Sequence, residues 1–259
     1  MLTALVIIGV LALVVLAYGW FEAGWLRTRV LDVPVAGLPE ELEGLRIAHL
    51  SDFHLGPPSR GAVAVRRAAD WVRERKPDLT VVTGDLLTHP RGRAQLDAAL
   101  HDLDAYAVLG NHDVAVTRDP FSRASALGGL PATLLDDASR LLDLRGAPVQ
   151  LAGTAPRPWG SLPEPDPAAA FRILLSHYPR LHAPGFQLVL AGHMHAGQIV
   201  LPYPGGKVRL AHLRSRLTEG LYRDEDVTLH VSPGLGTTFV PFRFFARPEA
   251  TELVLRRLA

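Results

Sequence analysis

The sequence predicts an α/β protein in which two β-sheets pack together with helices outside, behind an apolar N-terminal helix. Apolar, strand-like runs alternate with helical patterns from residue 45 to residue 109, an order that implies parallel strands covered by helices. From residue 198 onwards the pattern changes to strands separated by Gly and Pro turns. An α/β half followed by a β-rich half is typical of two stacked sheets.

Residues 1–21 are predicted to form a transmembrane anchor. No charged side chain occurs from residue 2 to residue 21, and about 20 apolar residues in a helix span a hydrocarbon core of roughly 30 Å. Aromatic residues typical of membrane interfaces stand at the end of this run: Tyr18, Trp20, Phe21 and Trp25. A cleaved signal peptide is the alternative, but the run is long and no Lys or Arg precedes it.

The charges that flank the apolar segment bear on orientation. Arg27 and Arg29 follow the segment and nothing basic precedes it, so the positive-inside rule favours the cytoplasm for the rest of the chain. We therefore expect a single-pass protein of the (inner) cell membrane, with the side of the membrane left open because two charges decide it.

Residues 22–43 are predicted to be a juxtamembrane linker, because they contain Val33-Pro34-Val35 and the stretch Gly37-Leu38-Pro39-Glu40-Glu41. No further break of linker character, no repeat and no low-complexity segment follows. Residues 44–259 are therefore expected to form one domain.

Each element of that domain is predicted from its hydrophobic period. Residues 60–75 and 94–103 carry apolar residues at helical spacing, for example Val65, Ala68 and Val72. Continuous apolar runs predict strands at 45–50, 79–83, 106–109, 171–175 and 187–191. Shorter runs between turns predict further strands at 198–201, 207–210, 227–232 and 251–256.

Composition excludes several classes of function. The formal net charge is +1, which argues against a broad basic surface for nucleic acid, so no nucleic-acid partner is expected. The chain has no cysteine, which removes disulfides, zinc-thiolate sites and thiol nucleophiles.

Five polar clusters each follow an apolar, strand-like run. The carboxyl ends of strands are where open α/β sheets place ligand sites, so we expect the clusters to meet. Each cluster alone has a structural alternative, since Gly-Asp is common at turns and Asn-His-Asp can cap a helix. The clusters are Asp52-Phe53-His54, Gly84-Asp85, Gly110-Asn111-His112-Asp113, Ser176-His177 and Gly192-His193-Met194-His195.

The side chains of these clusters suit a pair of divalent metal ions. Carboxylates, imidazoles and one amide, without thiolate, are ligands for borderline-to-hard ions that hold a phosphate ester. Asp85 is best placed to bridge two ions, because a carboxylate can offer both of its oxygens. Ions about 3.5–4 Å apart would hold a bridging hydroxide and clamp the phosphate during in-line displacement. The candidate metal ligands are Asp52, His54, Asp85, Asn111, His177, His193 and His195.

His112 is the candidate general acid, because it adjoins a ligand yet is free to reach the leaving oxygen. Asp113 is a candidate to orient the His112 ring, with a helix N-cap as an equal alternative. Met194 is expected to point away from the metals into packing. Structural or solvated roles are expected for the histidines outside the clusters: His49, His89, His101, His182, His212 and His230.

These motifs resemble the calcineurin-like metallophosphoesterase superfamily over residues 46–198. The match is D-x-H at Asp52 and His54, G-D at 84–85, G-N-H-D at 110–113, the lone His177, and G-H-x-H at 192–195. Residues 197–198, 232–236 and 241–243 are similar to a bacterial membrane-associated branch with predicted phosphodiesterases and a UDP-diacylglucosamine hydrolase.

The resemblance implies a four-layer α/β/β/α sandwich with two divalent ions, such as manganese, iron or zinc. By position, one ion would use Asp52, His54, Asp85 and His195. The other would use Asp85, Asn111, His177 and His193, and His112 would be the acid.

The chain departs from that branch at three places. Met194 and Ala196 replace Thr and Gly, and Ala196 brings a Cβ to a point where the backbone could approach substrate. Arg180 replaces Asp and is either a phosphate or headgroup clamp or a solvated surface arginine.

Four phenylalanines near the C-terminal end form either a lipid-facing lip beside the site or ordinary core: Phe239, Phe242, Phe244 and Phe245.

Together these features predict a membrane-anchored, two-metal phosphodiesterase that hydrolyses a lipid- or nucleotide-linked phosphoester. A phosphomonoesterase, or a non-catalytic scaffold of the same fold, is the alternative. The oligomeric state is left open.

Overall fold

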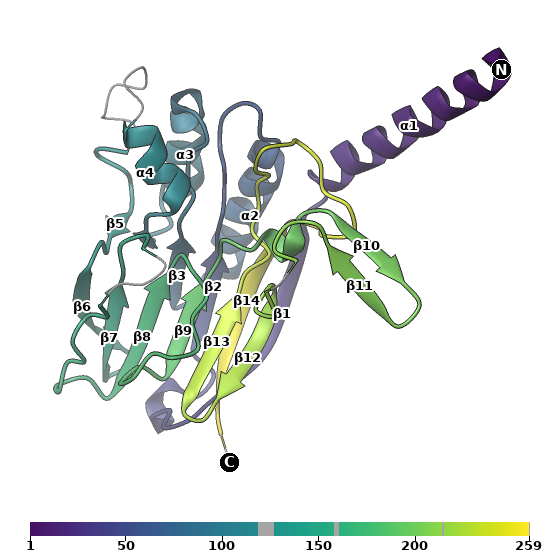
Figure 1. The fold of residues 1–259 in the computed structure, drawn as a ribbon. Coiled ribbons are helices and arrows are strands. Elements are labelled where there is room, and N and C mark those ends of the chain that lie inside the picture. The colour runs from purple at the N-terminus through teal and green to yellow at the C-terminus, as the bar shows by residue number, and fades with distance from the viewer. Residues whose placement is uncertain (119–126, 158–160, 214, 259) are drawn as a thin grey trace.

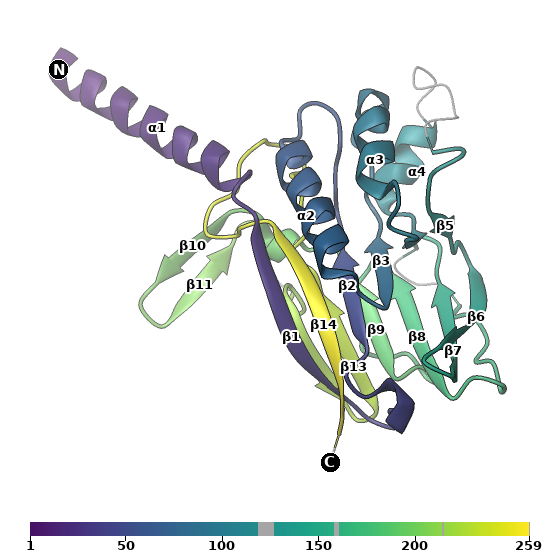
Figure 2. The ribbon, with the colours of Figure 1, turned by 180° about the vertical axis from the view of Figure 1, so that it is seen from behind.

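Two six-stranded sheets lie face to face in the computed structural model, which describes residues 1–118, 127–157, 161–213 and 215–258. Figure 1 shows the second sheet toward the viewer, and Figure 2 shows the first sheet with helices over its outer face. The N-terminal helix projects away from both sheets.

The first sheet has the strand order β1-β14-β2-β3-β4-β5. Strands β2, β3, β4 and β5 run parallel, β14 is antiparallel to β2, and β1 is parallel to β14. The strands are β1 (Arg27–Val35), β2 (Arg46–Leu50), β3 (Leu79–Thr83), β4 (Tyr106–Val108), β5 (Thr133–Leu134) and β14 (Glu249–Arg257).

The second sheet has the order β12-β13-β9-β8-β7-β6, and its four central strands are parallel. Its strands are β6 (Ala138–Leu144), β7 (Ala147–Gly153), β8 (Phe171–Ser176), β9 (Leu188–Ala191), β12 (Gly220–Asp224) and β13 (Val227–Val231). A separate antiparallel hairpin is formed by β10 (Val200–Tyr203) and β11 (Gly206–Arg209).

The helices are α1 (Leu2–Glu22), α2 (Gly61–Arg75), α3 (Arg93–Leu100) and α4 (Asn111–Arg118). Short 3-10 turns occur at Glu40–Leu42, Pro90–Gly92 and His195–Gly197. Helix α2 buries Ala64, Ala68 and Val72, one per helical turn, against the first sheet. It ends at Lys76, whose left-handed φ of 49° stops the helix.

Apolar side chains fill three layers. Ile47, Val81 and Ile173 belong to the core between the sheets, and Leu50 and Val82 to the core under α2 and α3. The third core lies on the outer face of the second sheet, where Phe186 covers Val189 and its neighbours. In the described ranges, connecting segments rather than helices cover this face (Figure 1).

The α/β class, the two packed sheets and the N-terminal apolar helix are confirmed. The predicted helices and strands all occur, with bounds that shift by a few residues. One stretch differs from its prediction. Residues 22–43, expected as a linker, contain β1, which pairs along its whole length with β14. Val33 and Val35 of β1 are fully buried, and Pro34 is tolerated because β1 is an edge strand.

Candidate metal centre

Backbone hydrogen bonds carry the register of β2 and β3 past the strand ends and set the first clusters side by side. The Asp52 amide donates to the Gly84 carbonyl at 2.9 Å, and the His54 amide donates to the Asp85 carbonyl at 2.9 Å. In the second sheet, the Gly192 amide donates to the His177 carbonyl at 3.1 Å. The clusters therefore meet because parallel strands bring their carboxyl ends to one edge.

Left-handed backbone conformations turn these side chains toward one another. Non-glycine residues rarely adopt a positive φ, and such residues concentrate at functional sites where the surrounding structure holds them. Five candidate ligands have this conformation: Asp52 (52°), His54 (45°), Asp85 (52°), His193 (70°) and His195 (49°).

The first donor group contains Asp52, His54, Asp85 and His195, all buried, with donor atoms within 4.8 Å of one another. His54 Nε2 lies 3.1 Å from His195 Nε2 and 3.3 Å from Asp85 Oδ2. His195 Nε2 lies 3.4 Å from Asp52 Oδ1. Two carboxylates and two imidazoles thus point at one space of the size that a metal ion needs.

The second donor group shares Asp85 with the first and adds His177 and His193. His177 Nε2 lies 3.4 Å from Asp85 Oδ2, 3.1 Å from His193 Nδ1 and 3.0 Å from Asn111 Oδ1. The structure therefore brings all seven predicted ligands together, in the two sets that the motifs indicate.

Two glycines let the loops approach this closely. A Cβ on Gly110 would lie 2.0 Å from Asp85 Oδ1, and a Cβ on Gly192 would lie 1.9 Å from Ser51 Oγ. Any larger residue at either position would therefore push the Asp85 or Asp52 side of the site apart.

Outer hydrogen bonds orient two of the imidazoles for metal binding. The Nδ1 atom of His177 lies 2.8 Å from the Thr83 carbonyl, which can only accept, so Nδ1 carries the proton. In the neutral ring, Nε2 is the nitrogen whose lone pair is available to a metal ion. His54 Nδ1 lies 3.0 Å from Thr88 Oγ1. These donors fit divalent cations in both chemistry and orientation.

A buried hydrogen-bond chain supports Asp52 from below. Ser51 Oγ donates to Asp52 Oδ2 at 2.6 Å, and Thr83 Oγ1 donates to Ser51 Oγ at 2.7 Å. His49 Nε2 is 2.9 Å from Thr83 Oγ1, and His49 Nδ1 is 2.8 Å from His230 Nδ1 on the opposite sheet. The prediction of structural roles for His49 and His230 agrees with this position, but the link to Asp52 has no signal in the sequence.

The pKa values reflect opposite effects of burial and charge. Burial disfavours a charged His177, but the adjacent Asp85 carboxylate outweighs it and raises the pKa of His177 to about 9. Burial raises the pKa of the Asp52 carboxyl. Burial, together with His177, lowers the pKa of His193 to about 3. Burial thus disfavours the charged form of each of these side chains, and the carboxylate and imidazolium charges partly offset that cost.

His112 lies at the edge of the donor groups and remains partly exposed. Its amide donates to Asp85 Oδ1 at 2.8 Å, and its ring stands edge-on to the His54 ring with centroids 4.9 Å apart. Its Nε2 is 3.4 Å from Thr238 Oγ1. Burial lowers the pKa of His112, partly opposed by Asp85. This ring can therefore reach a group bound over the donors.

Asp113 is fully buried in the first turn of α4, and its contacts are with the backbone. Its Oδ1 accepts from the amides of Leu86 and Leu87 at 2.8 and 3.0 Å, and its Oδ2 accepts from the Gly110 amide at 2.8 Å. Burial, followed by Asp85, raises its pKa to about 7. Asp113 is the third residue of α4 and therefore not the N-cap itself, but it caps the helix by accepting from the amide of Gly110, which precedes the helix. Its carboxylate has no bond to the His112 ring.

Two residues beyond the predicted set hold the loops over the site. The Gln198 amide donates to the Thr238 and Val240 carbonyls and accepts from the Thr238 amide. Arg243 is fully buried, donates to backbone carbonyls of residues 233–246, and has Nη2 3.3 Å from His195 Nδ1. Both residues lie in the motif segments 197–198 and 241–243, but these contacts cannot be inferred from the sequence because they form between loops that only folding brings together.

Two cavities flank the donor groups. The Tyr178 cavity, about 670 Å³, is lined by His193 together with Tyr178, Arg180, Leu181, Met194 and Leu217. The Val240 cavity, about 300 Å³, is lined by His195 together with Ile199, Leu210, Phe239 and Val240. Met194 is buried in the core as expected, and Arg180 is half-buried in the Tyr178 cavity rather than fully solvated.

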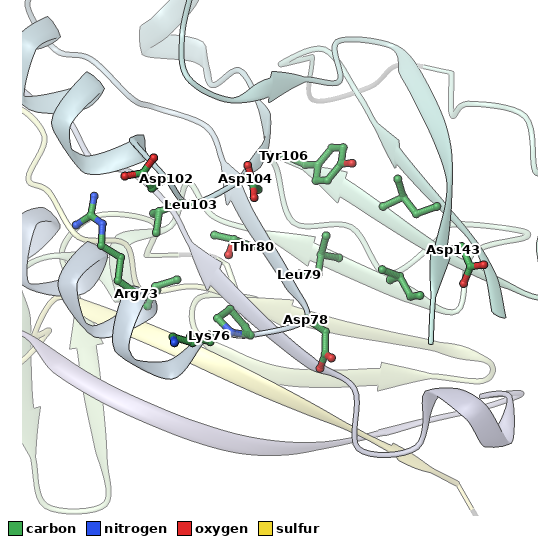
Figure 3. A pocket seen from close by; sticks show the side chains of 14 residues that line it. Arg73, Lys76, Asp78, Leu79, Thr80, Asp102, Leu103, Asp104, Tyr106 and Asp143 are labelled. Carbon is green, nitrogen blue, oxygen red and sulfur yellow. The ribbon is translucent and has the colours of Figure 1, made fainter. Parts of the chain in front are cut away.

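A further cavity of about 470 Å³ lies at the opposite edge of the first sheet (Figure 3). It adjoins Leu79 and Tyr106, at the amino ends of β3 and β4, and is lined by charged side chains such as Arg73 and Asp104. It contains none of the candidate ligands, which follow the carboxyl ends of these strands.

Comparison with known proteins agrees with this geometry. The family model described as calcineurin-like phosphoesterase matches residues 45–197. A Danio rerio protein named transmembrane protein with metallophosphoesterase domain is 34% identical over 98% of this chain and 62% of its own length. This chain therefore spans somewhat less than two thirds of that relative.

Two bacterial relatives match over most of their length. The uncharacterized metallophosphoesterase YkoQ of Bacillus subtilis is 29% identical over 83% of this chain and 84% of its own. The UDP-2,3-diacylglucosamine pyrophosphatase LpxG of Chlamydia trachomatis is 28% identical over 93% of each chain.

Proposed function

The chain belongs to the calcineurin-like phosphoesterase family, and from this premise we propose that it is a membrane-anchored, two-metal phosphodiesterase acting on a lipid-linked phosphoester. The observation that carries the proposal is that two donor groups share one carboxylate, Asp85. A carboxylate shared between two donor groups can bridge a pair of adjacent ions, and a pair of ions suits phosphate-ester hydrolysis.

We assign the first ion to Asp52, His54, Asp85 and His195. The second would be held by Asp85, Asn111, His177 and His193. Two divalent ions, when bound, polarise phosphate oxygens and lower the pKa of water so that it can attack phosphorus. Manganese, iron and zinc all suit this mixed oxygen and nitrogen set.

The protein's own residues complete the site around these donors. His112 is proposed to donate a proton to the leaving oxygen, because its ring borders the first donor group and is partly exposed. Asp113 is proposed to act indirectly, by fixing the loops that carry Asp85 and Asn111. It does so through the Leu86, Leu87 and Gly110 amides.

The two cavities favour a diester over a monoester. A diester has a substituent on each side of phosphorus, and the Tyr178 and Val240 cavities lie next to His193 and His195 respectively. A monoester would need one such space.

The linings of the cavities favour a lipid-linked substrate. The exposed lining of both cavities is mostly apolar surface, although histidine and other polar residues also contribute, and apolar surfaces accommodate acyl chains. Arg180 in the Tyr178 cavity is available to pair with a phosphate or headgroup. The relative named as a UDP-2,3-diacylglucosamine pyrophosphatase points to the same chemistry, and a nucleotide-linked lipid is the first substrate to test.

Membrane anchoring is proposed from α1. This helix has 21 residues, and 6% of its most apolar window is buried against the rest of the protein. A helix of this length and composition is sufficient to span a bilayer.

The test is metal binding and hydrolysis by the full chain in detergent micelles. We expect two equivalents of Mn²⁺ and Mn²⁺-dependent cleavage of an aryl phosphodiester, with slower cleavage of the matching monoester. Asp85→Asn should lose both metal and activity. Asp104→Asn, in the cavity of Figure 3, is the matched control and should keep both. A chain that binds no metal, or an Asp85→Asn variant with full activity, would refute the proposal.

A non-catalytic scaffold is the competing function, and one variant separates the two. Replacing His112 leaves every proposed ligand in place, so a scaffold would keep its partner and its metals. An esterase would keep its metals and lose rate.

A further inference from the structure

The β10–β11 hairpin has one apolar face. Leu201 pairs with Val208 and Tyr203 pairs with Gly206, so these residues share a side of the two-stranded ribbon. Leu210 continues the same side, since its amide bonds the Ile199 carbonyl at 2.9 Å.

The opposite face of the hairpin carries Val200, Pro202, Lys207 and Arg209, and it is held to the protein, with Val200 buried. It presents Lys207 and Arg209, and both pair with Glu219. This pairing fixes which side of the hairpin turns toward the domain and leaves the apolar side turned away.

The apolar face has large exposed fractions for such residues. Leu201, Tyr203, Val208 and Leu210 are 51, 55, 39 and 50% exposed. A two-stranded hairpin is marginally stable in water unless its apolar face is covered, so this face is built to meet an apolar surface.

Two phenylalanines extend this face along the adjoining loop. Phe239 is 85% exposed and Phe245 is 59% exposed, whereas Phe242 and Phe244 are partly buried. The predicted lip is therefore divided. Phe239 and Phe245 are largely exposed, with single ring contacts to His112 and Tyr18 respectively. Phe244 and Phe242 pack against Tyr18 and Trp20 at the end of α1.

The hairpin is tied to the end of the apolar helix. The Val200 amide donates to the Phe244 carbonyl at 2.9 Å, and the Phe244 amide donates to the Gln198 carbonyl at 3.0 Å. The Phe244 ring packs so closely on Gly19 of α1 that a Cβ there would lie 2.3 Å away. The Tyr18 ring contacts both Phe244 and Phe245. The hairpin and α1 thus leave the domain from the same corner (Figures 1 and 2).

We propose that the apolar face of the β10–β11 hairpin, with Phe239 and Phe245, inserts into the bilayer surface at the base of α1. This inference rests on the proposed anchoring by α1: lipid is the favoured occupant because the proposed anchor leaves the domain at the corner from which the hairpin projects. Tyr203 and Phe side chains are of the kind found at membrane interfaces. Glu219 pairs with both Lys207 and Arg209 and offsets one of their two positive charges. Contact would persist at high salt because it depends mainly on apolar burial.

Insertion would set the metal centre at the membrane surface. Leu210, Phe239 and Val240 line the cavity that His195 also lines, so the same residues border lipid on one side and the donors on the other. The mouth of the site would then open where a lipid phosphate lies.

The test uses the full chain in nanodiscs of phosphatidylcholine and phosphatidylglycerol. The chain has no cysteine, so Val208→Cys and Lys207→Cys each give a single site for an environment-sensitive fluorophore on opposite faces of one strand. Arg223→Cys on β12 is a second, exposed control. Lipids carrying a quencher near the headgroup end of the acyl chain report insertion.

We expect a blue-shifted emission and strong quenching at residue 208, and weak quenching at residues 207 and 223, unchanged at high salt. Equal quenching at 207 and 208, or none at 208, would overturn the proposal. A blue shift at 208 without lipid quenching would also overturn it, because a second copy or another protein would then cover the hairpin. Failure of the chain to enter nanodiscs would count against it equally. None of these outcomes depends on hydrolysis, so they are independent of the proposed activity.

Discussion

His54 Nε2 and His195 Nε2 lie 3.1 Å apart although 141 residues separate them in the sequence. Asp85 Oδ2 lies 3.3 Å from the first of these nitrogens, and Asp52 Oδ1 lies 3.4 Å from the second. Two imidazole nitrogens at this distance stabilise one another only through a proton or a cation between them. The stability of the loops that carry these residues therefore depends on whether a proton or a metal ion lies between them.

Metal removal should lower the stability of the fold. Ligands that bind only the folded state stabilise it by about 2.7 kcal/mol when present at one hundred times their dissociation constant. We expect the unfolding midpoint to fall in EDTA and to rise with added Mn²⁺ or Zn²⁺, measured by thermal denaturation in detergent.

The Asp85→Asn variant serves as the control for this effect. Because both donor groups use Asp85, its midpoint should respond little to EDTA or to added metal. An equal response in both proteins would place the stabilising ion elsewhere.

Replacing His112 with Asn should reduce kcat and leave metal content unchanged. General acids contribute typically about 10²–10⁴ in rate, and the contribution grows as the leaving group becomes a poorer one. The loss should therefore be large for an alkyl phosphodiester and small for a p-nitrophenyl phosphodiester. His101→Asn, at an exposed position outside the site, is the matched control. A loss that is the same for both leaving groups would contradict proton donation.

The candidate site could be predicted almost completely from the sequence, for a physical reason. Its ligands follow buried parallel strands, and parallel strands bring their ends to one edge. Asp113 shows the limit of that reasoning. Its neighbour in sequence, His112, faces the site, whereas one residue further along the α4 turn the Asp113 side chain faces the loop amides instead.

The sequence predicts most of the strands, including the exposed β10 and β11, but not β1, β5, β6, β7 and β12. Strands β2, β3, β8 and β9 are mostly apolar and almost wholly buried, and they are evident in the sequence. Strand β6 is mostly exposed and has no such pattern. Strand β1 contains Pro34 and pairs with β14 at the far end of the chain, so the local hydrophobic pattern does not predict a strand there.

Truncation should reveal that β1 belongs to the folded domain. A chain that begins at residue 44 lacks β1 and exposes the edge of β14, and it uncovers Leu255, the buried residue opposite Val33. We expect this chain to be insoluble or to unfold at a lower temperature. A chain that begins at residue 24 keeps β1 and the ion pair between Arg27 and Glu249. It should fold with a midpoint several degrees higher, measured by circular dichroism, and equal midpoints would contradict the assignment.

Acid should destabilise the fold through the buried pair His49 and His230. Burial lowers the pKa of His230 to about 3 and the pKa of His49 well below its ordinary value, while both titrate near 6.5 in the unfolded chain. The unfolded state then binds more protons below pH 6.5, so stability is complete above that pH. It falls as pH decreases toward 3, by up to about 1.4 kcal/mol per pH unit for each histidine.

A double variant isolates this contribution from the histidines of the metal centre. Replacing His49 and His230 together with leucine removes both partners of the 2.8 Å contact and leaves neither ring unpaired. Urea titrations in EDTA at pH 7 and pH 5 give the free energy of unfolding of both proteins at each pH. The loss between the two pH values can then be compared, because the titration of the other histidines is common to both proteins. We expect the variant to lose distinctly less stability between the two pH values. Identical losses would mean that the pair is already protonated, or exposed to water, in the folded protein.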